Sequence, residues 1–173
     1  MTVDVIEALG AMSSCSARIG AMRVSAKSDY ALRALIEIAL QAGDDPVSAE
    51  QIGKRQEIPH GFLQSILADL RRAGVVSSQR GQSGGWRLAR AADEISIADV
   101  IRAVDGPLVS VYGVRPESVS YNESAKVLQP VWIAARSSLR QVFEAVTIAA
   151  LANGALPADV LARTRDDEAW RPH

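Results

Sequence analysis

Apolar residues recur every three to four positions in three successive segments of the chain's first half, which predicts three helices. The first helix is expected within 25–43, the second begins at Ser48, and the third covers 59–72. Ser48 is followed three residues later by Gln51, the pattern of a capping box at a helix start. Only the few residues around "RQEIP" join the last two helices, so this pair has the proportions of a helix-turn-helix.

Two short β-like stretches, "VVSSQ" and "WRLAR", follow the third helix and are separated by "RGQSGG". Glycines let a hairpin tip bend and approach another backbone closely, and Arg80 is the side chain carried at that tip. A phosphate-binding loop is excluded, because no Gly-Lys-Ser/Thr follows the glycines and no helix begins after them. Three helices leading into a hairpin predict a mainly α fold with a small β-hairpin wing, a winged helix-turn-helix.

The second half of the chain predicts a long helix that starts near Gln129. Its apolar positions step by three and four residues, which is typical of a narrow coiled-coil seam. The seam covers only two heptads, so packing onto the chain's own domain remains an alternative to a dimerisation helix. We favour the dimer, and the expected interface residues are Trp132, Ala135, Leu139, Val142 and Val146.

These patterns divide the chain into five parts. A winged helix-turn-helix domain is expected at 22–106, an irregular loop and candidate effector region at 107–126, and the dimerisation helix at 127–152. Residues 1–21 are expected to be a disordered N-terminal extension, and 153–173 a frayed C-terminal tail.

Composition narrows the functional class. Of 173 residues, 48% are apolar and 23% charged, which is ordinary for a globular protein, and no apolar run is long enough to span a bilayer. The single cysteine, Cys15, excludes an internal disulfide and any multi-cysteine metal site, and it fits a reducing cytoplasm. With two histidines and no catalytic constellation, the sequence does not predict an enzyme.

Charge is unevenly distributed along the chain. Between 54 and 90 there are seven Lys and Arg against two Asp and Glu, whereas 91–173 holds eight against eleven. A basic block in a chain of net charge −1 predicts an anionic partner for that block alone.

Several motifs together resemble one family, the bacterial IscR/NsrR/CymR-type winged-helix regulators, also called the Rrf family. They are "MRVSAKSDYALRALIEIA" at 22–39, "IPHGFLQSILADLRRAGVVSSQRGQSGGWRLAR" at 58–90 and "ISIADVIRAVDGPL" at 95–108. The resemblance implies a dimeric winged helix-turn-helix that binds operator DNA and regulates transcription. Cluster-binding members carry three cysteines in the loop before the long helix, and 105–126 has none. The chain therefore resembles a cluster-free branch, for which we expect neither cofactor nor metal.

The resemblance also implies a set of DNA-binding residues. Arg23 and Lys27 would lie near phosphates, and Arg80 on the wing suits the narrow minor groove. Gln64 presents both a donor and an acceptor to an adenine edge, or is simply an exposed helix position. Ser48 leaves an amide-rich helix start that could meet a phosphate, or only caps the helix. The full expected set is Arg23, Lys27, Ser48, His60, Gly61, Phe62, Gln64, Arg80, Gly81, Gln82, Ser83 and Gly84.

The sequence thus supports one hypothesis and leaves two rivals open. The hypothesis is a homodimeric, cytoplasmic repressor of transcription that binds palindromic double-stranded DNA. Its effector would be a small molecule or a protein, and no membrane is involved. The first rival is a winged-helix protein-interaction module without DNA sequence specificity. The second is a ligand-responsive regulator whose pocket is built from the 105–126 loop and the long helix, and it differs from the hypothesis only in what controls it.

Overall fold

The computed structural model describes residues 24–41, 45–81 and 84–171. Its α-helices and strands are α2 (Ala26–Leu40), α3 (Ala49–Gln56), α4 (His60–Arg72), β1 (Val76–Gln79), β2 (Gly85–Leu88), α5 (Ile97–Val104), α6 (Leu128–Ala145), α7 (Ile148–Ala152) and α8 (Ala158–Arg163). Short 3₁₀ turns are η1 (Ala92–Glu94), η2 (Pro116–Ser118), η3 (Glu123–Ala125) and η4 (Asp167–Trp170). The three predicted N-terminal helices and the hairpin are confirmed, whereas the expected 1–21 extension lies outside the described residues.

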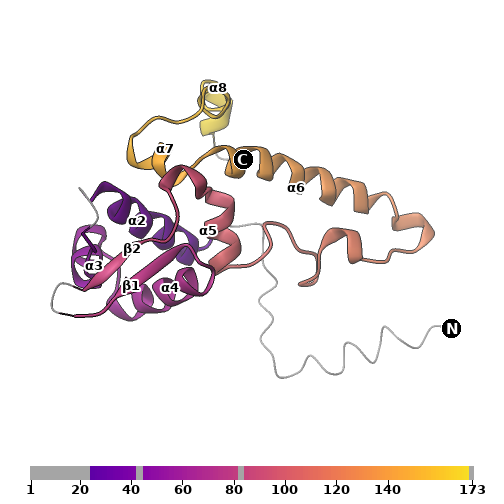
Figure 1. Cartoon of the computed structure of the whole chain (residues 1–173). Coiled ribbons are helices and arrows are strands. Elements are labelled where there is room, and N and C mark those ends of the chain that lie inside the picture. Colours follow the sequence, from indigo (N-terminus) through magenta and orange to yellow (C-terminus); the bar gives the residue numbers. More distant parts are fainter. Residues whose placement is uncertain (1–23, 42–44, 82–83, 172–173) are drawn as a thin grey trace, which may run out of the picture.

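Helix α2 lies at the centre of the apolar core and contacts α3, α4, α5 and α7 (Figure 1). Its inward residues Ala31, Ala34 and Leu35 are completely buried, as are Leu63 and Leu67 of α4. Burying a leucine side chain contributes about 1.5–3 kcal/mol, so the α2–α4 contact stabilises the domain strongly. The burial of Leu63 and Leu67 also fixes which side of α4 faces outward.

Two capping boxes begin α3 and α5. The amide of Gln51 donates to the Ser48 hydroxyl at 3.1 Å, and the Ser48 amide donates back to Gln51 Oε1 at 3.1 Å. Ser96 and Asp99 repeat this arrangement at the start of α5. The predicted capping box at Ser48 is therefore confirmed.

The hairpin pairs β1 and β2 antiparallel, from Val76 opposite Leu88 to Gln79 opposite Gly85. Val47 joins its outer edge, exchanging backbone hydrogen bonds with Trp86 at 2.9 and 2.8 Å. This third segment anchors the hairpin to the turn before α3. Gly85 permits the close approach, because a Cβ there would lie 2.6 Å from the Val47 carbonyl oxygen.

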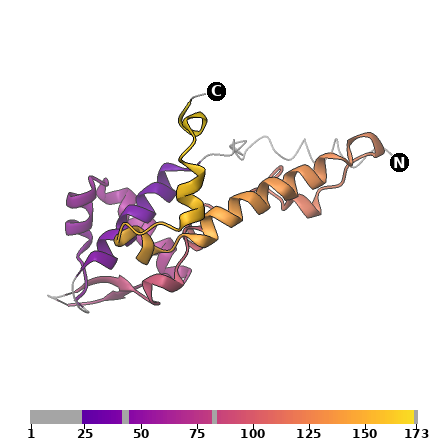
Figure 2. The same ribbon diagram turned by 90° about the horizontal axis from the view of Figure 1, so that it is seen from above.

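Helix α6 projects from the domain as an arm, as Figures 1 and 2 show from two directions. None of its residues is fully buried, and its contacts are with α5 and η2. The prediction of one helix through 152 is wrong, because α6 ends at Ala145 and a separate α7 begins at Ile148. Between them Thr147 forms a β-bridge with Ser96, which brings Ile148 into the core.

The tail after α7 is also more ordered than expected. Residues 158–163 form α8 after Pro157, and Trp170 Nε1 donates to the Thr164 carbonyl oxygen at 2.7 Å. The expectation of a frayed tail over 153–173 is therefore wrong for its described part. In the described portion of the chain, no helix is long and apolar enough to cross a membrane.

Replacing Gly85 with alanine should lower the free energy of unfolding by about 1–3 kcal/mol, because the new methyl group collides with the Val47 backbone. Urea denaturation measures the change. The matched control is Gly61→Ala, where a Cβ meets no heavy atom within 4 Å outside its own helix. That variant should be unchanged or more stable by up to about 1 kcal/mol. Equal losses in both variants would contradict the steric explanation.

Candidate DNA-binding surface

One side of α4 is polar and open to solvent. Leu63, Ile66, Leu67 and Leu70 are buried, which turns Gly61, Gln64, Ser65 and Arg72 outward. We call these four residues the outer face of α4. They recur at helical spacing on one stripe, so a flat or grooved partner could contact them together.

The first turn of α4 adds two exposed rings to this surface. His60 Nε2 lies 3.4 Å from Gln64 Nε2, within the same exposed helix turn. Phe62 is 58% exposed and packs edge-to-face on Tyr30 of α2, with ring centroids 6.4 Å apart. The structure thus brings the predicted residues His60, Gly61, Phe62 and Gln64 together at one helix end.

An ion pair holds α4 onto α2. Lys27 Nζ lies 2.5 Å from Asp69 Oδ2 and donates to the Val104 carbonyl oxygen at 2.9 Å. The hydrogen bond from Lys27 keeps the pKa of Asp69 below its usual range. The ammonium group of Lys27 therefore ties α2, α4 and α5 together, and its predicted contact with a phosphate stays a prediction.

A polar network fixes α3 against α2. Arg33 donates to the carbonyl oxygen of Gln56 and, at 3.1 Å, to Gln56 Oε1. Gln56 Nε2 in turn donates to Glu37 Oε1 at 2.6 Å, and Arg55 pairs with Glu37 at 3.3 Å. These contacts lie just before the turn into α4, so they constrain the angle between the two helices of the helix-turn-helix.

The wing extends beyond α4 and carries Arg80 at the end of β1. Arg80 is exposed, and Gly81 next to it has φ 114°, a conformation that favours glycine. Gly84 is packed so closely that a Cβ would lie 2.5 Å from the Gln79 carbonyl oxygen. The other predicted residues Arg23, Gln82 and Ser83 lie outside the described residues.

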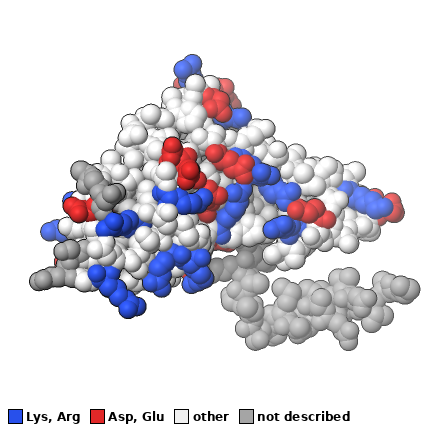
Figure 3. All heavy atoms as spheres, viewed as in Figure 1, with Lys and Arg blue, Asp and Glu red and all other residues white. Residues whose placement is uncertain are grey.

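Basic side chains that the residue-by-residue predictions missed belong to the same surface. Arg71 and Arg72 end α4, and Arg71 reaches Ser78 of β1 at 3.4 Å. Arg87 of β2 donates to Gln79. Lys and Arg gather on the side of the molecule where α4 and the hairpin lie, whereas both signs mix around α5 and α6 (Figure 3). The excess of Lys and Arg over Asp and Glu between positions 54 and 90 was the sequence signal that could have identified these arginines.

A sequence model of a known family matches residues 24–154 of the chain, and its description is "Rrf2: Iron-dependent Transcriptional regulator". The chain belongs to the Rrf2 family. It is 44% identical over 146 residues to the HTH-type transcriptional regulator Rv1287 of Mycobacterium tuberculosis, a match covering 84% of this chain and 90% of that protein. It is 33% identical over 132 residues to CymR of Bacillus subtilis, covering 76% and 91%.

Solved structures of Rrf2 regulators have the same fold. The structure of CymR, the global cysteine regulator of B. subtilis, matches with a TM-score of 0.65 at 30% identity, over 76% of this chain and 97% of that one. T. potens IscR matches with a TM-score of 0.63 at 29% identity, over 86% and 96%. The winged-helix prediction is confirmed, and this Rrf2 protein is a DNA-binding transcriptional regulator rather than an enzyme.

The Rrf2 description names iron, but the loop between α5 and α6 lacks the usual ligands of an iron–sulfur cluster. Residues 105–126 contain neither cysteine nor histidine, the soft and borderline ligands of iron clusters. Asp105 instead accepts hydrogen bonds from the hydroxyls of Ser25 and Ser28, which fastens the start of α2 to the end of α5. Within 24–41, 45–81 and 84–171, no three His, Cys, Asp or Glu residues gather as metal ligands would.

Four of the five predicted dimer residues lie on one side of α6, whereas the fifth, Val146, is buried. Trp132, Ala135, Leu139 and Val142 are half-buried along α6, where Trp132 Nε1 donates to the Tyr121 hydroxyl at 3.1 Å. Val146 follows α6 and is 2% exposed, packed inside its own chain. The more exposed apolar residues at the start of the arm are Val127, Leu128, Val131 and Ile133.

Replacing Asp69 with asparagine should destabilise the fold by about 1–2 kcal/mol at pH 7, because the Lys27 ammonium loses its charged partner. The lowered pKa of Asp69 means that its stabilisation is present at neutral pH and is lost as the pH falls through the folded-state value. Urea denaturation of the wild type and Asp69→Asn from pH 7 to pH 3 should therefore show their difference in the free energy of unfolding narrowing below about pH 4. A gap that stays constant over this range would contradict the ion-pair assignment.

Proposed function

We propose that the chain is a homodimeric repressor that binds a palindromic operator through two copies of the α4 outer face and the wing. The observation that carries this proposal is the division of α4 into a buried leucine-rich side and an exposed polar side. That division leaves Gly61, Gln64 and Ser65 available at the end where a recognition helix meets base edges. A major groove about 12 Å wide accepts such a helix.

Each predicted contact has a chemical role on the operator. Gln64 would donate to and accept from an adenine edge, and its proximity to His60 restrains its side chain. Gly61 lets the backbone approach the duplex closely. Arg71 and Arg72 would neutralise phosphates, which sets register but carries no sequence information.

Arg80 would enter the minor groove beside the site that α4 reads. The supporting observation is its exposed position just after β1, in a hairpin whose other strand, β2, is anchored to Val47 through Trp86. A guanidinium group on such a hairpin reaches out without rearranging the domain, and narrow minor grooves attract it through enhanced negative potential.

The arm supplies the proposed dimer contact. Trp132, Ala135, Leu139 and Val142 recur at steps of three and four along α6, Leu128 and Val131 extend the same stripe, and each of these residues is at least partly exposed. Pairing this stripe with a second copy would bury it and set two α4 helices at a fixed spacing. Val146 is left out of this interface because its side chain is buried in its own chain.

We also propose that this regulator works without an iron–sulfur cluster, because the loop between α5 and α6 offers carboxylates and no thiolates or imidazoles. The remaining rival is a winged-helix module that binds a protein. The excess of arginine over acidic side chains at α4 and the wing favours DNA over that rival.

Arg80→Ala should weaken binding to DNA from upstream of the protein's own gene and make the logarithm of affinity less dependent on the logarithm of salt concentration, by about one unit of slope. Fluorescence anisotropy across a salt series measures both effects, with scrambled DNA as competitor. The control is Arg163→Ala in α8, which is also exposed and should behave as wild type. Identical affinity and slope in wild type and Arg80→Ala would contradict the wing contact. Absence of any salt dependence in the wild-type complex would favour the protein-binding module.

Val131→Asp should convert the dimer to a monomer, because two carboxylates would be buried against each other at the α6 contact. Sedimentation equilibrium should then give one 18.5 kDa chain instead of two. The control, Ser137→Asp, adds the same charge to an exposed position on the opposite side of α6 and should stay dimeric. Dissociation by both variants, or by neither, would exclude this stripe as the interface.

A further inference from the structure

A hollow of about 540 Å³ opens where α5, the following loop and α6 meet. Its charged lining consists of Arg102, Arg115, Glu117, Arg136 and Arg140, and residues 106–109 complete the wall. We call it the arginine pocket. It shares no residue with the DNA-binding surface, and its volume is in the range of small-molecule sites.

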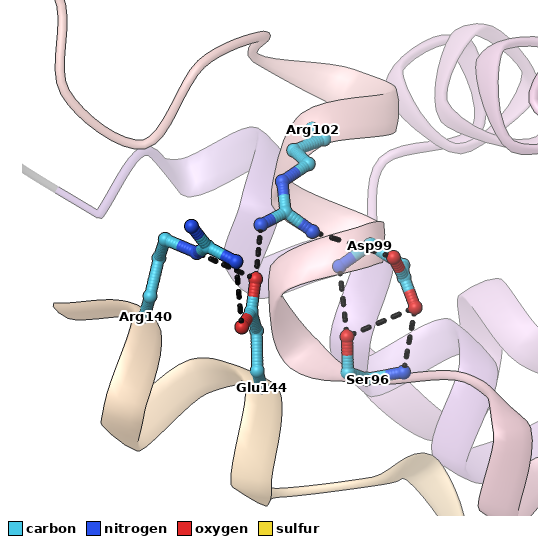
Figure 4. Close-up of polar contacts among 5 residues, drawn as sticks. All are labelled: Ser96, Asp99, Arg102, Arg140 and Glu144. Atoms are coloured by element: carbon cyan, nitrogen blue, oxygen red, sulfur yellow. Dashed lines mark hydrogen bonds and ion pairs between the residues drawn. The ribbon is translucent and has the colours of Figure 1, made fainter. Parts of the chain in front are cut away.

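Arginines from three separate elements converge on this pocket. Arg102 belongs to α5, Arg115 precedes η2, and Arg136 and Arg140 lie one helical turn apart on α6. Figure 4 shows the guanidinium groups of Arg102 and Arg140 approaching Glu144 from α5 and α6. Four guanidinium groups against the single carboxylate of Glu117 give the lining a net positive charge.

The carboxylates present do not saturate these arginines. Arg136 pairs with Glu117 at 2.5 Å, while Arg102 and Arg140 share Glu144 at 2.5 and 2.9 Å. Arg102 also pairs with Asp99 of its own helix at 3.5 Å, so three carboxylates face four arginines. Arg115 forms no ion pair with any residue in the described ranges. Each guanidinium group carries five N–H donors, so many remain for a ligand. Hydrogen bonds from Arg140 and Arg102 keep the pKa of Glu144 below its usual range, as expected beside concentrated positive charge.

We propose that the arginine pocket binds a small organic or inorganic anion with at least two carboxylate or phosphate groups. Paired planar guanidinium groups recognise both kinds of group through two parallel hydrogen bonds. The spread of the arginines over three elements requires a ligand with more than one anionic group to engage them together.

Such an anion would couple the arm to the DNA-binding domain. Arg102 is part of α5, which packs on α2 and α4, whereas Arg136 and Arg140 move with α6. A ligand held by both sides would compete with Glu144 and change the contact between the two parts. The pocket would then be the effector site of the proposed repressor, and this regulatory step alone rests on the proposed function.

Isothermal titration calorimetry on the full chain tests the binding, with citrate and pyrophosphate as separate probes at constant ionic strength. Citrate represents carboxylate ligands and pyrophosphate represents phosphate ligands, so the preferred probe identifies the chemistry. The double variant Arg115→Gln with Arg140→Gln should weaken binding by about tenfold or more. The control double variant, Arg163→Gln with Arg165→Gln, removes the same charge elsewhere and should bind as wild type.

A variant that binds the probe more tightly than the wild type would distinguish a ligand site from a cluster of ion pairs with a structural role alone. Glu117→Gln removes the competing carboxylate from the lining, so it should tighten probe binding roughly threefold to fivefold. A collapsed or misfolded pocket could not produce that result.

Three outcomes would overturn the proposal. The first is that neither probe binds the wild type. The second is that both probes bind the Arg115/Arg140 variant as tightly as the wild type. The third is that neither probe binds the wild type and the Arg115/Arg140 variant also dissociates the dimer. The last result would mean that a second copy's carboxylates occupy these arginines. DNA anisotropy on the wild type with and without probe separates the two proposals. DNA binding without anion binding refutes only the pocket, whereas anion binding without DNA preference refutes only the repressor.

Discussion

The burial of one side of α4 against α2 is the constraint on which the rest of the molecule depends. Leu63, Ile66, Leu67 and Leu70 are completely buried, so α4 cannot rotate about its axis without exposing leucine to water. The opposite stripe must therefore stay in solvent, and it holds short or polar side chains instead of apolar ones. A helix of this kind can form a stable domain and still present a precise polar surface to DNA.

Polar contacts then restrict how α4 sits on the domain. Burial fixes the side of the helix that faces inward, but it allows sliding and tilting. The Lys27–Asp69 pair limits that movement at one end, and the Arg33–Gln56–Glu37 network holds the preceding helix. The bond from Val47 to Trp86 places the wing relative to the same core. Helix α4 and the wing are therefore both held on the same domain core, whereas α6 projects from that domain.

The sequence predicted the local elements well, because their signals are local. Helical spacing gave α2, α3 and α4, and Ser48 with Gln51 gave a capping box that the structure contains. The sequence did not predict that Lys27 would face Asp69, because the position of Lys27 near the start of α2 suited a phosphate contact equally well. The end of α6 at Ala145 depends on the pairing of Thr147 with Ser96, a contact between distant residues. The sequence indicated 107–126 as a candidate effector region, but it did not predict the arginine pocket, because the four arginines are spread from 102 to 140.

In the proposed complex, two copies of the α4 outer face read two equal half-sites. Selection of bound sequences from random double-stranded DNA tests it most directly, comparing the wild type with Gln64→Ala. We expect a palindrome whose half-sites lie about one helical turn or a multiple of it apart, with Gln64→Ala losing base preference at one symmetric pair of positions. Enrichment of no sequence by the wild type, or an unchanged motif with Gln64→Ala, would contradict it.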